Sequence, residues 1–207
     1  MLHSIILDMG NVLLRYDPEH FLDRLEIHSP QDRALLLREI FHSPLWPKLD
    51  SGELTEAGLE KQALKNLPQR LHAVAHKLIF AWDDPIEPIP GMAAFLTDCK
   101  SAGLGLYLLS NASVRQPEYW PRVPGSSLFD GVVVSALCRC VKPGEEIYRH
   151  LLEKYHLNPK ECLFADDMEA NVHAAEALGI HGFIFTGDVL ALRRQVEALG
   201  VSPEKGE

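Results

Sequence analysis

Five short apolar runs, rich in β-branched or aromatic residues, limit this chain to a small set of folds. They cover Ser4–Leu7, Leu104–Leu109, Gly131–Val134, Glu161–Ala165 and Gly182–Phe185. From Leu104 onward, helix-like sequence or a long connection separates each run from the next, as in βαβ crossovers and parallel sheets. The near-continuous apolarity of each run is typical of strands covered on both faces. The sequence therefore predicts an α/β fold with a parallel sheet flanked by helices.

A long insertion separates the first and second runs, with far more residues than one crossover helix requires. Helices are expected to begin at Pro18, Pro30 and Glu56, and a further one to run from Pro68 to about Trp82. Prolines 85, 88 and 90 then form a stiff connection. We therefore predict a core of residues 1–16 and 85–207 and a mostly helical cap of residues 17–84. The cap is expected to lie over the carboxyl edge of the sheet as a lid.

Composition restricts the class of partner. The 207-residue chain carries a formal net charge of −9, so we expect neither a nucleic-acid nor a membrane partner, because both would require a basic face. A small anionic substrate would instead require a metal ion or a well-placed lysine. The four cysteines show no CxxC spacing, and the apolar run at the start is too short for a signal peptide or a membrane span. We predict a reduced, cytoplasmic protein of undefined oligomeric state.

Carboxylates follow two of the predicted strands. Asp8 ends the first apolar run and precedes Gly10, and Asp166-Asp167 end the fourth. The carboxyl ends of parallel strands are where ligands bind in α/β proteins. Bringing two carboxylates to about 4 Å costs about 1 kcal/mol in water and about 4 near a protein surface. Converging carboxylates therefore favour a hard divalent cation, and we expect Mg²⁺. A carboxylate such as Asp8 can also attack phosphorus as a nucleophile.

Phosphate-binding groups are expected at two further positions. Ser110 and Asn111 end the second run, where a hydroxyl and backbone N–H groups can hold a phosphoryl oxygen. Lys142 precedes Pro143, which we expect in the first turn of a helix over Gly144–Tyr155. Lys142 would then point away from the helix and could neutralise charge on a transferring phosphoryl group.

Together these motifs resemble the haloacid dehalogenase superfamily, most of whose members are phosphatases. The matching stretches are Leu7–Leu13, Leu108–Asn111, Lys142-Pro143, Phe164–Asn171 and Ala174–Ile180. The resemblance implies a Rossmann-like sheet and a helical cap of the first type. It also implies Asp8 as nucleophile, Ser110 and Lys142 as phosphate binders, and a metal held by Asp8, the Gly10 carbonyl and Asp167. Asp166 would be a close or water-mediated partner of that metal.

One branch of the superfamily is especially similar, with Asp-x-Gly-Asn-Val at the nucleophile and a cap segment like Gly52–Thr55. It includes an α-D-glucose-1-phosphate phosphatase, so a small phosphorylated metabolite such as a sugar phosphate is the expected substrate. Most phosphatases of the superfamily carry an acid–base Asp where this chain has Gly10. Its loss could raise the barrier by roughly 3–5 kcal/mol. Asn11 could orient an oxygen there, and Asp17 could act as a substitute acid.

Two alternatives follow from Gly10. Carbon–halogen hydrolases of the same fold also lack the second Asp, but they need no cation, which would leave Asp166-Asp167 unexplained. A catalytically weak binding or regulatory protein would have no need for the charge cluster. Trp46 in the cap and Trp120 after the second run are candidates to line the substrate entrance. The leading hypothesis is a Mg²⁺-dependent phosphatase that acts on a small phosphomonoester through Asp8.

Overall fold

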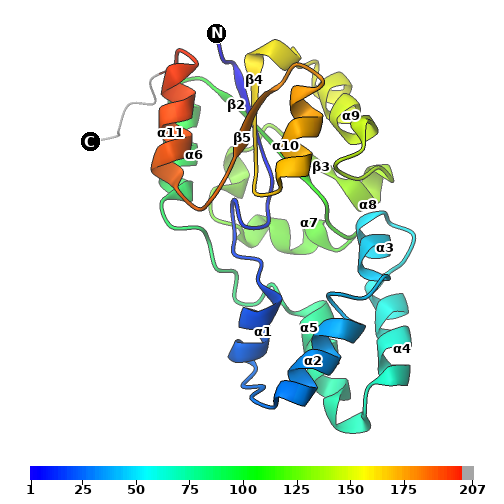
Figure 1. Ribbon diagram of the computed structural model, residues 1–207. Coiled ribbons are helices and arrows are strands. Elements are labelled where there is room, and N and C mark those ends of the chain that lie inside the picture. Colours follow the sequence, from blue (N-terminus) through cyan, green and yellow to red (C-terminus); the bar gives the residue numbers. More distant parts are fainter. Residues whose placement is uncertain (202–207) are drawn as a thin grey trace.

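The computed structural model describes residues 1–201, which form a five-stranded parallel sheet (Figure 1). The strand order is β3-β2-β1-β4-β5, so β1 lies at the centre. The bounds are Ser4–Leu7 for β1, Gly105–Ser110 for β2, Gly131–Val134 for β3, Cys162–Asp166 for β4 and His181–Ile184 for β5. Each of the five predicted strands is present within one residue of its expected bounds. The predicted parallel α/β fold is therefore confirmed.

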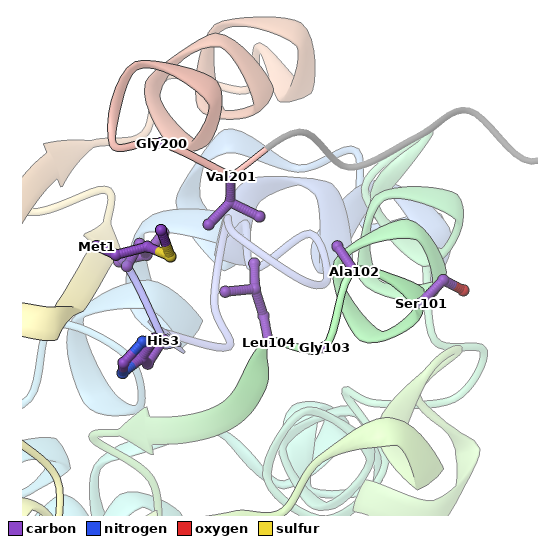
Figure 2. Close-up of a pocket in the computed structure, with 9 residues that line it drawn as sticks. Met1, His3, Ser101, Ala102, Gly103, Leu104, Gly200 and Val201 are labelled. Carbon is purple, nitrogen blue, oxygen red and sulfur yellow. The ribbon is translucent and has the colours of Figure 1, made fainter.

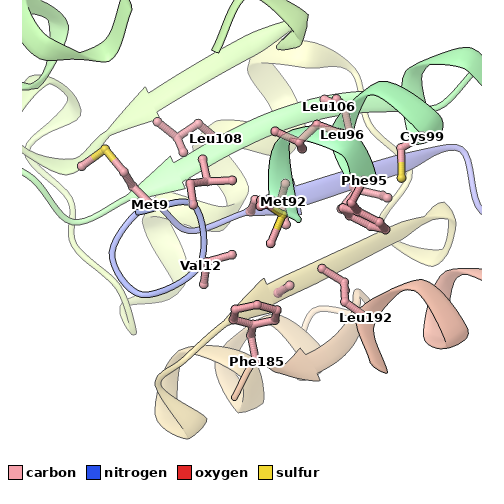
Figure 3. Packing of buried hydrophobic residues seen from close by; sticks show 14 of the residues in the cluster. Met9, Val12, Met92, Phe95, Leu96, Cys99, Leu106, Leu108, Phe185 and Leu192 are labelled. Carbon is pink, nitrogen blue, oxygen red and sulfur yellow. The ribbon is translucent and has the colours of Figure 1, made fainter. Parts of the chain in front are cut away.

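Helices cover both faces of the sheet because side chains along each strand alternate in direction. Ile5 and Leu7 of β1 pack with α6 (Met92–Ser101) and α11 (Val189–Ala198), a cluster that Figure 3 shows. Ile6 points the other way and packs with α9 (Glu145–Tyr155) and α10 (Glu169–Glu176). All three side chains are fully buried. Because β1 is buried on both faces, its position in the sheet is fixed, and so is the position of Asp8 directly after its carboxyl end.

The insertion forms five α-helices with an apolar cluster of their own, below the carboxyl edge of the sheet in Figure 1. They are α1 (Pro18–Arg24), α2 (Pro30–Glu39), α3 (Trp46–Asp50), α4 (Glu56–Asn66) and α5 (His72–Phe80). The three expected helix starts are confirmed, and the side chains of Asp17, Ser29 and Thr55 cap them by accepting backbone N–H bonds. The short helix α3 was not among the helix starts expected from the sequence. The division at residues 16/17 and 84/85 stays a prediction.

Two sets of contacts at the chain crossings link the cap to the rest of the molecule. The Trp82 ring lies 5.2 Å from the Tyr16 ring and 5.3 Å from the Tyr119 ring, between centroids. The neighbouring Asp83 is 2% exposed and forms ion pairs with Arg115 and Arg122. Both chain crossings between cap and core are therefore packed against the core.

Some predicted helix ends need correction. Pro143 is not in the first turn of α9, because the helix begins at Glu145 with Gly144 as its N-cap residue. The short helices α7 (Gln116–Tyr119) and α8 (Ser135–Cys138) were not expected from the sequence.

Within residues 1–201, no helix has the length and apolar character that a membrane crossing requires.

Candidate active site

The register of the sheet brings the predicted acids to one edge. Leu7 of β1 pairs with Leu108 of β2 and Ala165 of β4. The residues that follow these three therefore lie at the same level along the strand direction. The backbone N–H of Asp8 donates to the Ala165 carbonyl at 3.0 Å. Carboxylate oxygens of Asp8, Asp166 and Asp167 lie within 4.8 Å of one another. Residues more than 150 positions apart in the chain thus form one acidic cluster, because the strands are parallel neighbours.

Lys142 lies between two of these carboxylates. Its Nζ is 2.9 Å from Asp8 Oδ1 and 2.6 Å from Asp166 Oδ2, and the Lys142 side chain is 1% exposed. Burial alone would lower the pKa of Lys142, but the charges of Asp8 and Asp166 outweigh burial and raise it. Lys142 therefore stays an ammonium ion beside the proposed nucleophile.

Asn111 holds the backbone of Lys142. Its side-chain Nδ2 donates to the Lys142 carbonyl at 2.9 Å, and its Oδ1 accepts the Lys142 N–H at 2.9 Å. Asn111 lines the pocket, but its side-chain amide is thus engaged by the protein rather than directed at a substrate. Ser110 is 1% exposed and lines the same pocket. No residue among 1–201 forms a hydrogen bond with the Ser110 hydroxyl, so this group is available to a ligand.

The two adjacent acids at the end of β4 have different surroundings. Asp166 is fully buried and accepts hydrogen bonds from the Met168 N–H at 2.8 Å, from Asn171 Nδ2 at 3.0 and 3.1 Å, and from Lys142. Asp167 is half-buried, lines the pocket and accepts one bond from Asn11 Nδ2 at 3.0 Å. Asp167 therefore has free acceptor capacity toward the pocket, whereas the bonds of Asp166 orient Lys142.

Burial has an electrostatic cost at the proposed nucleophile. Desolvation raises the pKa of Asp8 from 3.8 to about 6, with Lys142 lowering it and Asp166 raising it further. One ammonium group therefore does not compensate the three carboxylates of the cluster. A cation at this point would lower the free energy of the ionised cluster.

Asn11 and Asp17, the two residues considered in place of the missing acid at Gly10, both use their side chains in hydrogen bonds within the protein. Asn11 Oδ1 accepts the Tyr16 N–H at 3.0 Å, and Nδ2 donates to Asp167, so both ends of this side chain are engaged. Asp17 is not in the pocket lining. Its carboxylate accepts the N–H groups of Glu19 and His20 and an Arg15 bond at 2.8 Å. Burial opposes the shift, yet these bonds lower the pKa of Asp17, which makes it a poor substitute acid.

Cap and core together enclose a pocket of about 270 Å³ above Asp8. Trp46, one of the two candidate entrance residues, lines it. The other, Trp120, lies outside the lining and packs on Phe129 with ring centroids 5.1 Å apart. Two cap acids in the lining, Asp50 and Glu56, were not expected from the sequence. Only the neighbouring Gly52–Thr55 segment marked this part of the cap.

Among the carboxyl groups of the cap, that of Asp50 has the most perturbed pKa. Desolvation and the charge of Asp8 raise its pKa from 3.8 to about 7, and Lys142 lowers it in part. The Asp50 backbone is fixed to the core, since its carbonyl accepts a bond from the Ser135 hydroxyl at 2.6 Å. No residue among 1–201 donates a hydrogen bond to its carboxylate. The cap thus presents an unpaired carboxyl group to the space above Asp8.

A larger hollow of about 480 Å³ lies at the opposite end of the sheet, near the amino terminus (Figure 2). Apart from the chain terminus, His3 is its only titratable group among the lining residues, and Nδ1 of His3 lies 3.1 Å from Glu161. Size alone therefore does not identify the active site, because the clustered chemical groups are at the carboxyl edge.

The structure thus combines a parallel α/β sheet, an inserted helical cap and an acid–lysine cluster at the carboxyl end of β1. A family model described as haloacid dehalogenase-like hydrolase matches residues 3–179. The chain belongs to this family. The branch that contains the glucose-1-phosphate phosphatase remains a prediction.

Relatives within the family include phosphatases. The chain is 28% identical to the sesquiterpene phosphatase astK of Aspergillus oryzae, over 95% of both chains. It is 27% identical to a phosphorylated carbohydrates phosphatase of Thermotoga maritima, over 86% of this chain and 82% of that one. The structure resembles a family enzyme of Bacteroides thetaiotaomicron in complex with magnesium and inorganic phosphate. That likeness has a TM-score of 0.71 at 19% identity, over 93% of this chain and 99% of that one, and it concerns the fold alone.

Proposed function

We propose that this hydrolase is a Mg²⁺-dependent phosphatase that cleaves small phosphomonoesters through an aspartyl-phosphate on Asp8. The observation that carries the proposal is the cluster of Asp8, Asp166 and Asp167 at the carboxyl edge of the sheet, with Lys142 between Asp8 and Asp166. Phosphatases recur among relatives that align over most of the chain, which supports the reaction class.

The donor set fits magnesium. Mg²⁺ is typically held by one or two carboxylates, with water and substrate phosphate completing its octahedron. Asp8 and Asp167 line the pocket and offer such oxygens, and the Gly10 carbonyl would be the third protein ligand. Asp166 already accepts four hydrogen bonds, so we assign it to Lys142 rather than to direct ligation. A bound Mg²⁺ would withdraw charge from the phosphoryl oxygens and lower the repulsion between phosphate and acids.

The residues of the chain divide the reaction into two steps. One Asp8 oxygen attacks phosphorus, and the bond from phosphorus to the ester oxygen breaks; the leaving oxygen takes the electron pair as an alkoxide and gains a proton from solvent to become the alcohol. Lys142 and Ser110 hold phosphoryl oxygens as negative charge moves toward the leaving group. Water then attacks the phosphorus of the aspartyl-phosphate, which releases phosphate and restores the Asp8 carboxylate. Because Gly10 carries no acid, substrates with good leaving groups should react fastest.

Other readings have weaker support. The names of the relatives span a sesquiterpene phosphatase and carbohydrate phosphatases, so they do not select a substrate, and the sugar phosphate expected from the sequence stays a prediction. Carbon–halogen hydrolysis would leave the acidic cluster without a function. A purely regulatory protein would likewise have no use for a buried lysine between two acids.

Turnover of 4-nitrophenyl phosphate tests the proposal. We expect activity with Mg²⁺, none with a chelator, and a loss of at least about 10³-fold in Asp8→Asn. Asp23→Asn is the matched control, because Asp23 is an exposed acid of the cap that pairs with Arg33. Equal activity of Asp8→Asn and the wild type, or full activity without a divalent cation, would overturn the proposal. Activity on 2-haloacids without metal would favour the carbon–halogen alternative.

A further inference from the structure

One part of the pocket lining has a composition that the phosphatase reaction does not explain. Most of the polar lining residues belong to the core, near Asp8, Ser110 and Asp167. The other lining residues are mostly aromatic and aliphatic. The apolar wall comprises Leu14, Tyr16, Trp46, Leu49, Ile79 and Trp82. No lysine, arginine or histidine lines the pocket among the described residues.

The apolar wall is a fixed surface. Tyr16 lies at its centre, with ring centroids 6.3 Å from Trp46 and 5.2 Å from Trp82. Trp46 packs in turn on Phe41 at 4.9 Å, and Ile79 is 1% exposed within the apolar cluster of the cap. Because neighbours hold these rings, the wall presents apolar area without ordering flexible side chains on binding.

Few carboxylate or amide groups remain for a polar ligand at the cap end. Glu56 is 7% exposed and already accepts a hydrogen bond from the Ser113 hydroxyl. Asp50 is the unpaired carboxyl. A polyol would leave several hydroxyl groups against the apolar wall, where a buried polar group without a partner costs about 1–3 kcal/mol. A second phosphate would face two carboxylates and no cation.

From this wall, and resting on the proposed phosphatase function, we infer the substrate class. The substrate is a phosphomonoester of a small, uncharged alcohol whose carbon skeleton is mostly apolar. The Trp46–Tyr16–Trp82 wall contacts that skeleton, and Asp50 reaches a polar group at or near the ester oxygen. The pocket volume of about 270 Å³ is just below the usual range for ligand pockets of about 300–1,000 Å³, which favours a compact skeleton. The sugar phosphate predicted from the sequence is the competing class.

A substrate panel separates the classes. We expect kcat/KM for 2-naphthyl phosphate and geranyl phosphate to exceed that for glucose 1-phosphate and glucose 6-phosphate by at least about 100-fold. We expect no measurable turnover of fructose 1,6-bisphosphate. Acetyl phosphate, which has almost no leaving-group surface, reports the basal reaction. Equal or greater kcat/KM for the sugar phosphates overturns the inference and leaves the phosphatase function standing. Absence of turnover on every compound, acetyl phosphate included, overturns the phosphatase function itself.

Two tryptophan variants tie the preference to the wall. Trp46→Leu removes aromatic area from the lining and should lower kcat/KM for 2-naphthyl phosphate about tenfold or more, so that the ratio of kcat/KM for 2-naphthyl phosphate to kcat/KM for acetyl phosphate falls. Trp120→Leu is the matched control, because Trp120 packs on Phe129 outside the pocket. Circular dichroism and thermal unfolding establish that both variants fold. Equal effects of the two variants on 2-naphthyl phosphate would overturn the assignment of the wall.

Discussion

Replacing Gly10 by aspartate should restore an acid–base group that this active site lacks. The backbone at Gly10 is outside the left-handed region, and an added Cβ would lie 3.5 Å from Tyr16 Cβ, an ordinary van der Waals distance. Gly10→Asp therefore introduces no steric clash at Cβ. A positioned general acid contributes about 10²–10⁴-fold, or roughly 3–5 kcal/mol of barrier. The added negative charge near Asp8 is the opposing factor, and saturating Mg²⁺ should offset it.

The assay compares one good and one poor leaving group of similar size. For the wild type, kcat/KM for 4-nitrophenyl phosphate should greatly exceed that for benzyl phosphate, because only benzyl alcohol needs a proton as it leaves. In Gly10→Asp, benzyl phosphate should gain about 100-fold or more and 4-nitrophenyl phosphate much less. Gly10→Asn is the control of equal shape without an acid. Equal gains in both variants, or similar wild-type rates on both esters, would refute the reasoning. Similar wild-type rates would also make Asp50 the first residue to test as a resident acid.

Three further predictions concern the charges of the site in the absence or presence of metal. The folded state raises the pKa of Asp50 from 3.8 to about 7, so ionisation of this carboxyl opposes folding. Its stabilising contribution is complete below pH 3.8 and is lost as the pH rises through about 7. At pH 8 the free energy of unfolding of Asp50→Asn, measured in urea, should therefore exceed that of the wild type by up to about 4 kcal/mol. At pH 4 the two proteins should be about equally stable; a pH-independent difference would contradict this. Lys142→Met should destabilise the metal-free protein by about 3–5 kcal/mol in urea unfolding at pH 8, because two buried carboxylates lose their partner; a loss below about 1 kcal/mol would count against it. Mg²⁺ at about 100 times its Kd should add about 2.7 kcal/mol of stability, seen as a higher Tm, and Asp167→Asn should weaken that gain; an unchanged Tm in millimolar Mg²⁺ would argue against the site.

The fold was predictable because its signals are local and repeat along the chain. Each strand is a short apolar run, and the cap helices start at side chains that accept backbone N–H bonds, as at Asp17, Ser29 and Thr55. Helix α3 was missed because its five residues, Trp46–Asp50, are too few to show a helical period. Pro143 was misplaced because proline is equally compatible with the turn that precedes a helix and with its first turn.

The core of the site was predictable for a different reason, and the cap side was not. Asp8 and Asp166 end strands that a parallel sheet must bring to one edge, so their meeting follows from topology. The distinct surroundings of Asp166 and Asp167 depend on the tertiary placement of Asn171 and Asn11. Asp50 reaches the pocket through the tertiary placement of α3, and its raised pKa arises from burial that the sequence does not encode locally.

The most direct test of the central claim is the mass of the protein quenched in acid during turnover of 4-nitrophenyl phosphate with Mg²⁺. If Asp8 is the nucleophile beside the acidic cluster, the quenched wild type will carry one added phosphoryl group, and peptide mapping will locate it on Asp8. Asp8→Asn will carry none. A phosphoryl group on another residue, or steady turnover with no labelled protein under conditions that preserve acyl phosphates, would contradict the account.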